Sequence, residues 1–193
     1  MDSRKKVTVC LVISLILIAT TTLLTRGKPY YGPAPFPMDS AEKLSVDELA
    51  DKAGDGGTLI LPTWMPSQIK LRQIYFKGLA ILVYSDEDVR DYRDDDVTIQ
   101  IAKTRNIPTK EQLLHRRSSG EVIKVKESWI VISEDAVPGP DMIERGVEPI
   151  FSYFWHDGFY YIISGIKGET TREDMIKIVE NMEPVGQETL RKA

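Results

Sequence analysis

The chain has 193 residues, of which 42% are hydrophobic and 28% are charged. This length and composition predict one ordinary globular domain with an appendage, and they exclude both a wholly disordered chain and a polytopic membrane protein. The formal net charge is −4, and the body after residue 26 is more acidic still, so we expect no nucleic-acid partner.

An uncharged apolar segment, Val7–Leu24, directly follows the basic residues Arg4, Lys5 and Lys6. As a helix it would be about 27 Å long, close to the ~30 Å hydrocarbon layer of a bilayer. Basic residues before such a segment typically stay in the cytoplasm. Since no small-x-small cleavage site follows, the pattern favours an uncleaved signal anchor over a cleaved signal peptide or a buried helix. We therefore predict a cytoplasmic N-terminus at 1–6, a single-pass transmembrane signal anchor at 7–25 and an extracytoplasmic body at the cell membrane.

The single cysteine, Cys10, lies near the start of this apolar segment. Lipidation needs a cysteine at the end of such a segment, so Cys10 is interpreted as a small apolar residue of the anchor. With no other cysteine, the body has no internal disulfide and depends on its own core. Residues 26–39 include KPYYGPAPFP, whose prolines predict an extended linker.

The body is expected at 40–183, with a flexible tail at 184–193. Ser45 and Glu48 have the spacing of a capping box and predict a short helix at 41–53. Strand patterns then dominate. The predicted strands are 59–61, 69–76, 79–84, 97–102, 121–126, 129–133, 149–155 and 159–165.

Alternating polar residues, as in Val97–Ile101, indicate strands with one solvated face and favour an antiparallel sheet. Asp157-Gly158 predicts a tight hairpin turn. A polar helix is expected at 109–117, and a stronger one at 171–182 with an apolar stripe, for which Thr170 and Glu173 supply a capping box. The predicted fold class is α+β: an N-terminal transmembrane helix followed by a curved, mainly antiparallel sheet packed by a C-terminal helix.

The order of these features resembles a known family. Its marks are Leu61-Pro62 through Leu71, the strand ending at Ser85, the strand from Val97, and the closing hairpin Phe154–Gly165 with the helix after Thr171. The chain resembles, over roughly 59–183, an extracytoplasmic domain of unknown function shared by membrane-anchored, anti-sigma-associated regulators and sporulation-associated proteins.

That family is similar in architecture to lipoprotein carriers and periplasmic stress sensors, whose half-barrel sheets accept lipids or acylated ligands. The resemblance therefore implies binding of an apolar or lipidic ligand. This chain departs from the family at Pro66-Ser67-Gln68-Ile69, where members commonly have Pro-x-Gly-aromatic. The six residues before the apolar segment also leave no room for an anti-sigma module.

Patterns for catalysis and cofactors are sparse. His115 and His156 are the only histidines, so a zinc site of histidine and cysteine is not expected, and each histidine is interpreted as a solvated polar residue. The sequence has no G-x-S-x-G elbow, P-loop or dinucleotide fingerprint. We accordingly predict no catalytic residues and no cofactor.

The densest acidic stretch spans residues 86–96 and contains two arginines. Its carboxylates form a candidate Ca²⁺ site outside the cell. It lacks the glycine and the ligand order of an EF-hand, so a solvated loop is the favoured interpretation. The candidate ligands are Asp86, Asp88, Asp94 and Asp96.

Aromatic residues are concentrated in the predicted hairpin at 149–165. Alternation places some of them on each face of the sheet. Core packing is the first interpretation, and a ligand or partner groove is the second. The groove candidates are Trp64, Trp129, Tyr153, Trp155, Phe159 and Tyr161.

The function these patterns favour is a non-enzymatic, membrane-anchored extracytoplasmic binding or sensor-type domain. Its partner is the membrane together with an apolar ligand or an envelope or membrane protein. Anchoring raises the local concentration of such a domain, so weak contacts suffice. Two alternatives stay open: an envelope hydrolase that uses paired carboxylates, and a structural accessory subunit of a membrane complex.

Overall fold

The computed structural model describes residues 40–54, 57–86, 96–116, 120–135, 138 and 140–185. The strands are β1 (Glu42–Leu44), β2 (Ile60–Pro62), β3 (Lys70–Phe76), β4 (Ala80–Ser85), β5 (Val97–Lys103), β6 (Glu121–Val125), β7 (Ser128–Ser133), β8 (Pro149–His156), β9 (Phe159–Ile166) and β10 (Met182–Pro184). The helices are α2 (Val46–Ala53), the 3-10 turn η3 (Pro66–Gln68), α3 (Lys110–Arg116), α4 (Pro140–Arg145) and α5 (Arg172–Glu180).

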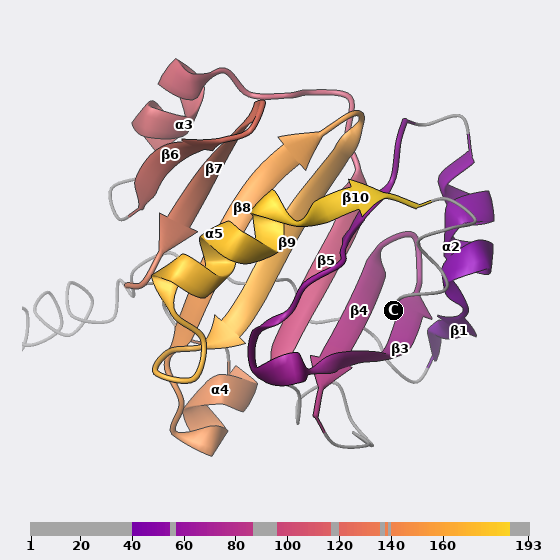
Figure 1. Ribbon diagram of the computed structural model, residues 1–193, viewed down its shortest axis with the longest axis horizontal. Helices are drawn as coiled ribbons and strands as arrows, with labels where there is room; N and C mark the ends of the chain where they lie inside the picture. The colour runs from indigo at the N-terminus through magenta and orange to yellow at the C-terminus, as the bar shows by residue number, and fades with distance from the viewer. Residues whose placement is uncertain are drawn as a thin grey trace, which may run out of the picture. The chain divides into compact units, whose positions relative to one another are not determined.

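Eight strands form one sheet in the order β1-β3-β4-β5-β9-β8-β7-β6 (Figure 1). Every neighbouring pair in this sheet is antiparallel. Strands β2 and β10 pair separately, also antiparallel. This short ribbon crosses the face of the large sheet beside α5 (Figure 1), so the chain has a second layer on that face.

The predicted fold class, α+β with a leading transmembrane helix, is wrong. The described chain is mostly antiparallel sheet, and its few helices have nine residues or fewer. None of the helices in these described ranges is long and apolar enough to cross a bilayer. The segment 7–25, to which the sequence assigns the anchor, and the linker 26–39 lie outside the described residues. The class differs because tight turns join β-rich segments directly, so short helices only cover edges and faces.

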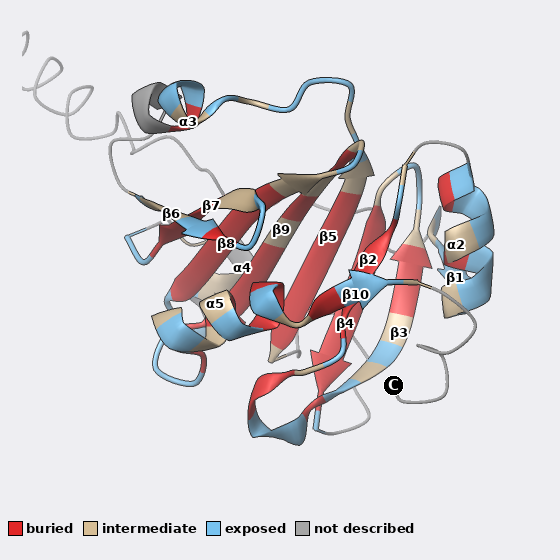
Figure 2. Ribbon diagram, turned by 45° about the horizontal axis from the view of Figure 1, so that its top comes forward, coloured by how far each residue is buried: buried red, intermediate tan, exposed pale blue. Residues whose placement is uncertain are grey.

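The main core lies between the large sheet and the layer that crosses it. Figure 2 shows the buried residues concentrated in the central strands. Helix α5 contributes Met175, Ile178 and Val179, all buried, from the apolar stripe that the sequence predicts. They pack with the alternate residues of β4, β5 and β9 that point to this face, such as Leu82, Ile99 and Ile163.

The opposite face of the sheet has two smaller buried clusters. One is formed by Tyr75, Ile81 and Val83. In the other, Leu113 of α3 packs with aromatic and aliphatic residues of the hairpin and of β7. Its buried members are Leu113, Val131, Phe151 and Tyr153. Both faces of the sheet are therefore apolar.

Helix caps follow the sequence closely at one helix and shift by one residue at another. Ser45 and Glu48 form the predicted capping box of α2, and the hydrogen bonds from Ser45 lower the pKa of the Glu48 carboxyl. At α5 the box is formed by Thr171 and Asp174. The prediction of Thr170 and Glu173 is wrong because α5 begins at Arg172, which makes Thr171 the N-cap, while Thr170 is buried against Gly165 of β9.

The aromatic hairpin β8–β9 turns at Asp157 and Gly158, as the sequence predicts. Both residues have positive φ, 38° and 84°, which is the geometry of a type I′ turn. The Asp157 carboxylate accepts a hydrogen bond of 2.6 Å from the backbone N–H of Thr58, and hydrogen bonding by Thr58 lowers its pKa. The hairpin tip is thus joined to the segment that leads into β2.

Candidate functional site

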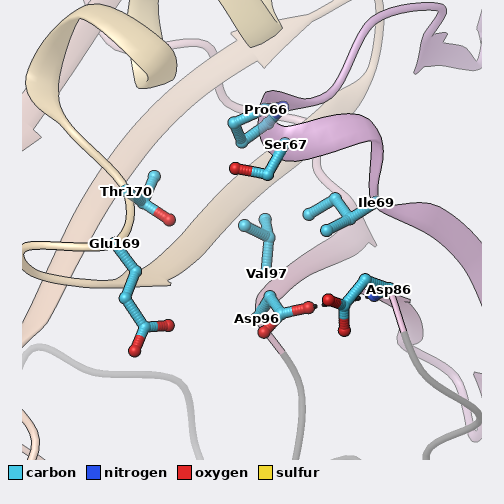
Figure 3. A pocket seen from close by; sticks show the side chains of 8 residues that line it. All are labelled: Pro66, Ser67, Ile69, Asp86, Asp96, Val97, Glu169 and Thr170. Atoms are coloured by element: carbon cyan, nitrogen blue, oxygen red, sulfur yellow. Dashed lines mark hydrogen bonds between the residues drawn. The ribbon is translucent and has the colours of Figure 1, made fainter.

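Two pockets are candidates for a binding site in the described residues. The larger, which we name the acidic pocket, has a volume of about 300 Å³. Figure 3 shows its side chains around a common space. It is lined by Pro66, Ser67, Ile69, Asp86, Asp96, Val97, Glu169 and Thr170.

Three distant parts of the chain build the acidic pocket. The turn η3 and the residue that follows it form one wall, the adjoining ends of β4 and β5 form the second, and the turn between β9 and α5 forms the third. Strands β4 and β5 are antiparallel neighbours in the sheet. Asp86 directly follows β4 and Asp96 directly precedes β5, so both lie at the same end of this strand pair. The backbone N–H of Asp86 donates a hydrogen bond of 3.1 Å to Oδ2 of Asp96.

The backbone of η3 is strained beside the acidic pocket. Ser67 and Gln68 are consecutive residues with φ of 51° and 60°, a conformation that favours glycine. Strain of this kind persists only where surrounding structure holds it, and it is frequent at functional sites.

The carboxylates of the acidic pocket have no ion-pair partner among the described residues. Among the described residues, no lysine or arginine forms an ion pair with Asp86, Asp96 or Glu169. Arg72 lies nearby, but its guanidinium donates hydrogen bonds to the backbone carbonyls of Ser85 and Asp86. The described residues that line the pocket therefore include three acids and no base.

Thr170 lies deep in the acidic pocket, with only 3% of its surface exposed. Its backbone N–H binds the carbonyl of Ile166 at 2.8 Å, while its hydroxyl forms no hydrogen bond with any described residue. In Figure 3 this hydroxyl points into the pocket. A Cβ on Gly165 would lie 2.7 Å from Thr170 Oγ1, so glycine at that position of β9 is what lets Thr170 lie so close to the sheet.

The second cavity, the apolar pocket, has a volume of about 150 Å³. It opens between α2 and one end of the central strands, and most of its lining comes from the main core. Its lining residues are Leu49, Lys52, Ala53, Leu59, Phe76, Gly78, Ala80, Ile101, Lys103 and Phe159.

Among the described residues that line the apolar pocket, the charged ones are two lysines. Lys52 is already neutralised, because its ammonium lies 2.9 Å from the Glu42 carboxylate and 5.0 Å from the centre of the Phe76 ring. Lys103 is exposed and forms no ion pair with a described residue. The free positive charge of this pocket is therefore that of Lys103.

The predicted calcium ligands are only partly placed. Asp86 and Asp96 lie together at the acidic pocket, whereas Asp88 and Asp94 lie outside the described residues. Within the described ranges, no three or more histidine, cysteine or acidic side chains converge closely enough to hold a metal ion.

The predicted aromatic groove is divided between the two faces of the sheet. Trp64, Phe159 and Tyr161 pack with the main core, and Trp129, Tyr153 and Trp155 pack with the cluster on the opposite face. Most of these rings have packing partners: Phe154 stacks on Tyr161 and Tyr160 on Trp155, each at 4.6 Å between ring centres, and the Lys110 ammonium lies 4.6 Å from the centre of the Trp129 ring. Of the six candidates, Phe159 alone lines one of the two pockets.

His156 is not among the described lining residues of either pocket. His156 is half-buried at the end of β8, and the side chain of His115 lies outside the described residues. Sequence reasoning missed Ser67, Glu169, Thr170 and Lys103 as pocket residues. The acidic stretch was the signal that pointed to the acidic pocket, because its residues Asp86 and Asp96 line it.

Comparisons with known proteins add little. The sequence matches no protein-family model and no curated protein. A crystal structure from Bacteroides thetaiotaomicron VPI-5482 is similar over 69% of this chain and 50% of its own chain, with 12% identity and a TM-score of 0.41. The chain therefore spans about half the length of that protein. A similarity of this size carries no argument about fold or function.

Proposed function

We propose that the chain is a non-enzymatic binding domain that acts outside the cytoplasm at a membrane, and that its ligand places one apolar group in the apolar pocket. The location is supported by the basic residues Arg4–Lys6 and the uncharged segment after them. The binding role is supported by the cavity itself. Confinement near a membrane would make even modest affinity for a ligand there effective.

The size of the apolar pocket limits what it can accept. A cavity of about 150 Å³ lined by apolar side chains accommodates a group of roughly the size of benzene. Complete ligand sites usually measure about 300–1,000 Å³, so a whole lipid does not fit. The pocket suits a single ring or the end of a short acyl chain, with the rest of the ligand outside.

The charge at the rim favours an acid as ligand. Lys103 offers an ammonium without an ion-pair partner in the described residues, next to the apolar lining from Phe159 and Ile101. A carboxylate on a short acyl chain would meet Lys103 while its chain enters the pocket. Because Lys103 is exposed, this ion pair adds only a modest part of the affinity.

The exposure of the described aspartates and glutamates favours a binding function over the hydrolase alternative. A general acid of a carboxylate pair is typically kept protonated by burial, and no described aspartate or glutamate is buried. An accessory subunit would expose an apolar patch. The large exposed hydrophobic residues in the described ranges are Ile107 and Ile143, which lie on different elements and form no such patch.

Calorimetric titration of the full-length chain with hexanoate, and with hexanamide as its uncharged analogue, tests this function. Ala53 lines the pocket from α2, so Ala53→Leu fills the cavity with an isobutyl group. Ala50→Leu is the matched control, because Ala50 is on the same helix and does not line the pocket.

We expect Ala53→Leu to abolish binding of both compounds and Ala50→Leu to preserve it. Lys103→Gln should weaken hexanoate about threefold and leave hexanamide unchanged. The proposal fails if the unmodified chain binds neither compound, or if the two leucine variants bind hexanoate equally well.

A further inference from the structure

We propose that the acidic pocket is a second, separate binding site, and that its ligand is an alkylammonium: a primary amine on a short aliphatic chain. This inference goes beyond the function proposed above. It concerns a different cavity and a ligand of opposite charge, and it stands or falls independently of the apolar pocket.

The first step is the hydroxyl of Thr170, which faces the acidic pocket and has no hydrogen-bond partner in the described residues. The hydroxyl is accessible from the pocket, since Ser152 Oγ is the buried side-chain oxygen that lacks a partner in the described part of the chain. Thr170 is 97% buried, its hydroxyl has no partner in the described residues, and it points into a pocket of about 300 Å³ (Figure 3). A ligand with a hydrogen-bond donor would satisfy it there.

The second step is the charge of the lining. Asp86, Asp96 and Glu169 come from separate parts of the chain and face the same space without a cationic partner in the described residues. An ionised carboxylate can accept hydrogen bonds but cannot donate them, whereas an ammonium can only donate them, through its three N–H groups. An ammonium in this pocket would donate hydrogen bonds to the Thr170 hydroxyl oxygen and to the carboxylates at the same time.

The third step distinguishes an organic cation from a metal ion. The acidic side chains of the described residues do not converge as metal ligands do, and the volume is far larger than a bare ion needs. Between the polar groups, Pro66, Ile69 and Val97 provide an apolar surface. That surface fits the methylene chain of an aliphatic amine, and a metal ion would gain nothing from it.

Calorimetric titration of the full-length chain with 1,5-diaminopentane tests the inference, with 1,5-pentanediol as the neutral analogue and CaCl₂ as the metal alone. Thr170→Val removes the hydroxyl and keeps the shape of the side chain. Glu169→Gln removes one carboxylate charge from the pocket. Glu180→Gln is the matched control, since Glu180 is an exposed acid at the end of α5 outside the pocket.

We expect saturable binding of the diamine with no saturable binding of the diol. Thr170→Val should weaken the diamine about tenfold and Glu169→Gln about threefold, while Glu180→Gln leaves it unchanged. Circular dichroism should show that each variant is folded.

The inference is overturned by any of three results. The first is the absence of saturable diamine binding to the unmodified chain. The second is an equal loss in the Glu169→Gln and Glu180→Gln variants, which would indicate a diffuse charge effect. The third is Ca²⁺ binding at the same residues that excludes the diamine, which would make the pocket a metal site.

Discussion

Tyr161→Phe tests how the crossing layer is held on the sheet. Tyr161 is fully buried, and its hydroxyl accepts a hydrogen bond of 3.0 Å from the backbone N–H of Ile60 in β2. The substitution keeps the ring, which stacks on Phe154, and removes only this acceptor. The N–H of Ile60 is then left buried without a partner, and such a group costs about 1–3 kcal/mol. We expect the free energy of unfolding to fall by that amount.

Tyr84→Phe is the control for this measurement. Tyr84 is also buried, but no hydrogen bond to its hydroxyl exists among the described residues, so we expect its substitution to change stability by less than about 0.5 kcal/mol. Urea denaturation of the full-length chain and both variants, followed by tryptophan fluorescence, gives the comparison. Equal stability losses in the two variants would refute the role assigned to the Tyr161 hydroxyl.

Two further predictions concern a close backbone contact and the pH dependence of stability. Gly57→Ala should destabilise the fold by several kcal/mol, or detach the segment before β2, because the added Cβ would lie 1.7 Å from the backbone oxygen of Asp157. Gly78→Ala, with positive φ but open space around the Cβ, should cost only about 1 kcal/mol in the same denaturation assay, and equal costs would contradict the contact. Burial raises the pKa of both Tyr84 and Tyr161, so above pH ~10 the unfolded chain loses protons that the folded chain keeps, and stability should fall with pH by about 1.4 kcal/mol per unit for each tyrosine. Each Tyr→Phe variant should show a shallower fall above pH ~10, and an unchanged slope would show that the tyrosine in question ionises alike in both states.

The strands and turns were largely predictable from the sequence. Alternation in Val97–Ile101 and the turn residues Asp157-Gly158 are local signals, and the structure contains the strand and the hairpin that they predict. The capping box at Ser45 is equally local. These features depend on neighbours within a few residues, so one sequence is sufficient to find them.

The end of the last helix was not predictable in the same way. Met182 has the spacing of the apolar stripe of α5, yet α5 ends at Glu180 and Met182 is in β10. It pairs there with Pro62 of β2, a residue far away in the sequence. Helical periodicity cannot reveal such a partner, because a buried methionine satisfies either arrangement.

The pockets could not be predicted because their residues come together only in the folded chain. Alternation shows that Phe159 and Tyr161 share one face of the sheet, but it does not show which segment crosses that face. The sequence therefore grouped them with Tyr153 and Trp155, which the structure places on the other face. Thr170 was assigned to a helix cap from its spacing alone, and its burial beside Gly165 depends on contact with β9.

Photolabelling of the full-length chain with a short diazirine-bearing carboxylic acid, mapped by mass spectrometry, tests the proposed binding function most directly. We predict that labels concentrate on lining residues of the apolar pocket, such as Leu49, Phe76 and Phe159, and that excess hexanoate removes them. Labels spread elsewhere on the chain, or labels that hexanoate does not displace, would contradict the account.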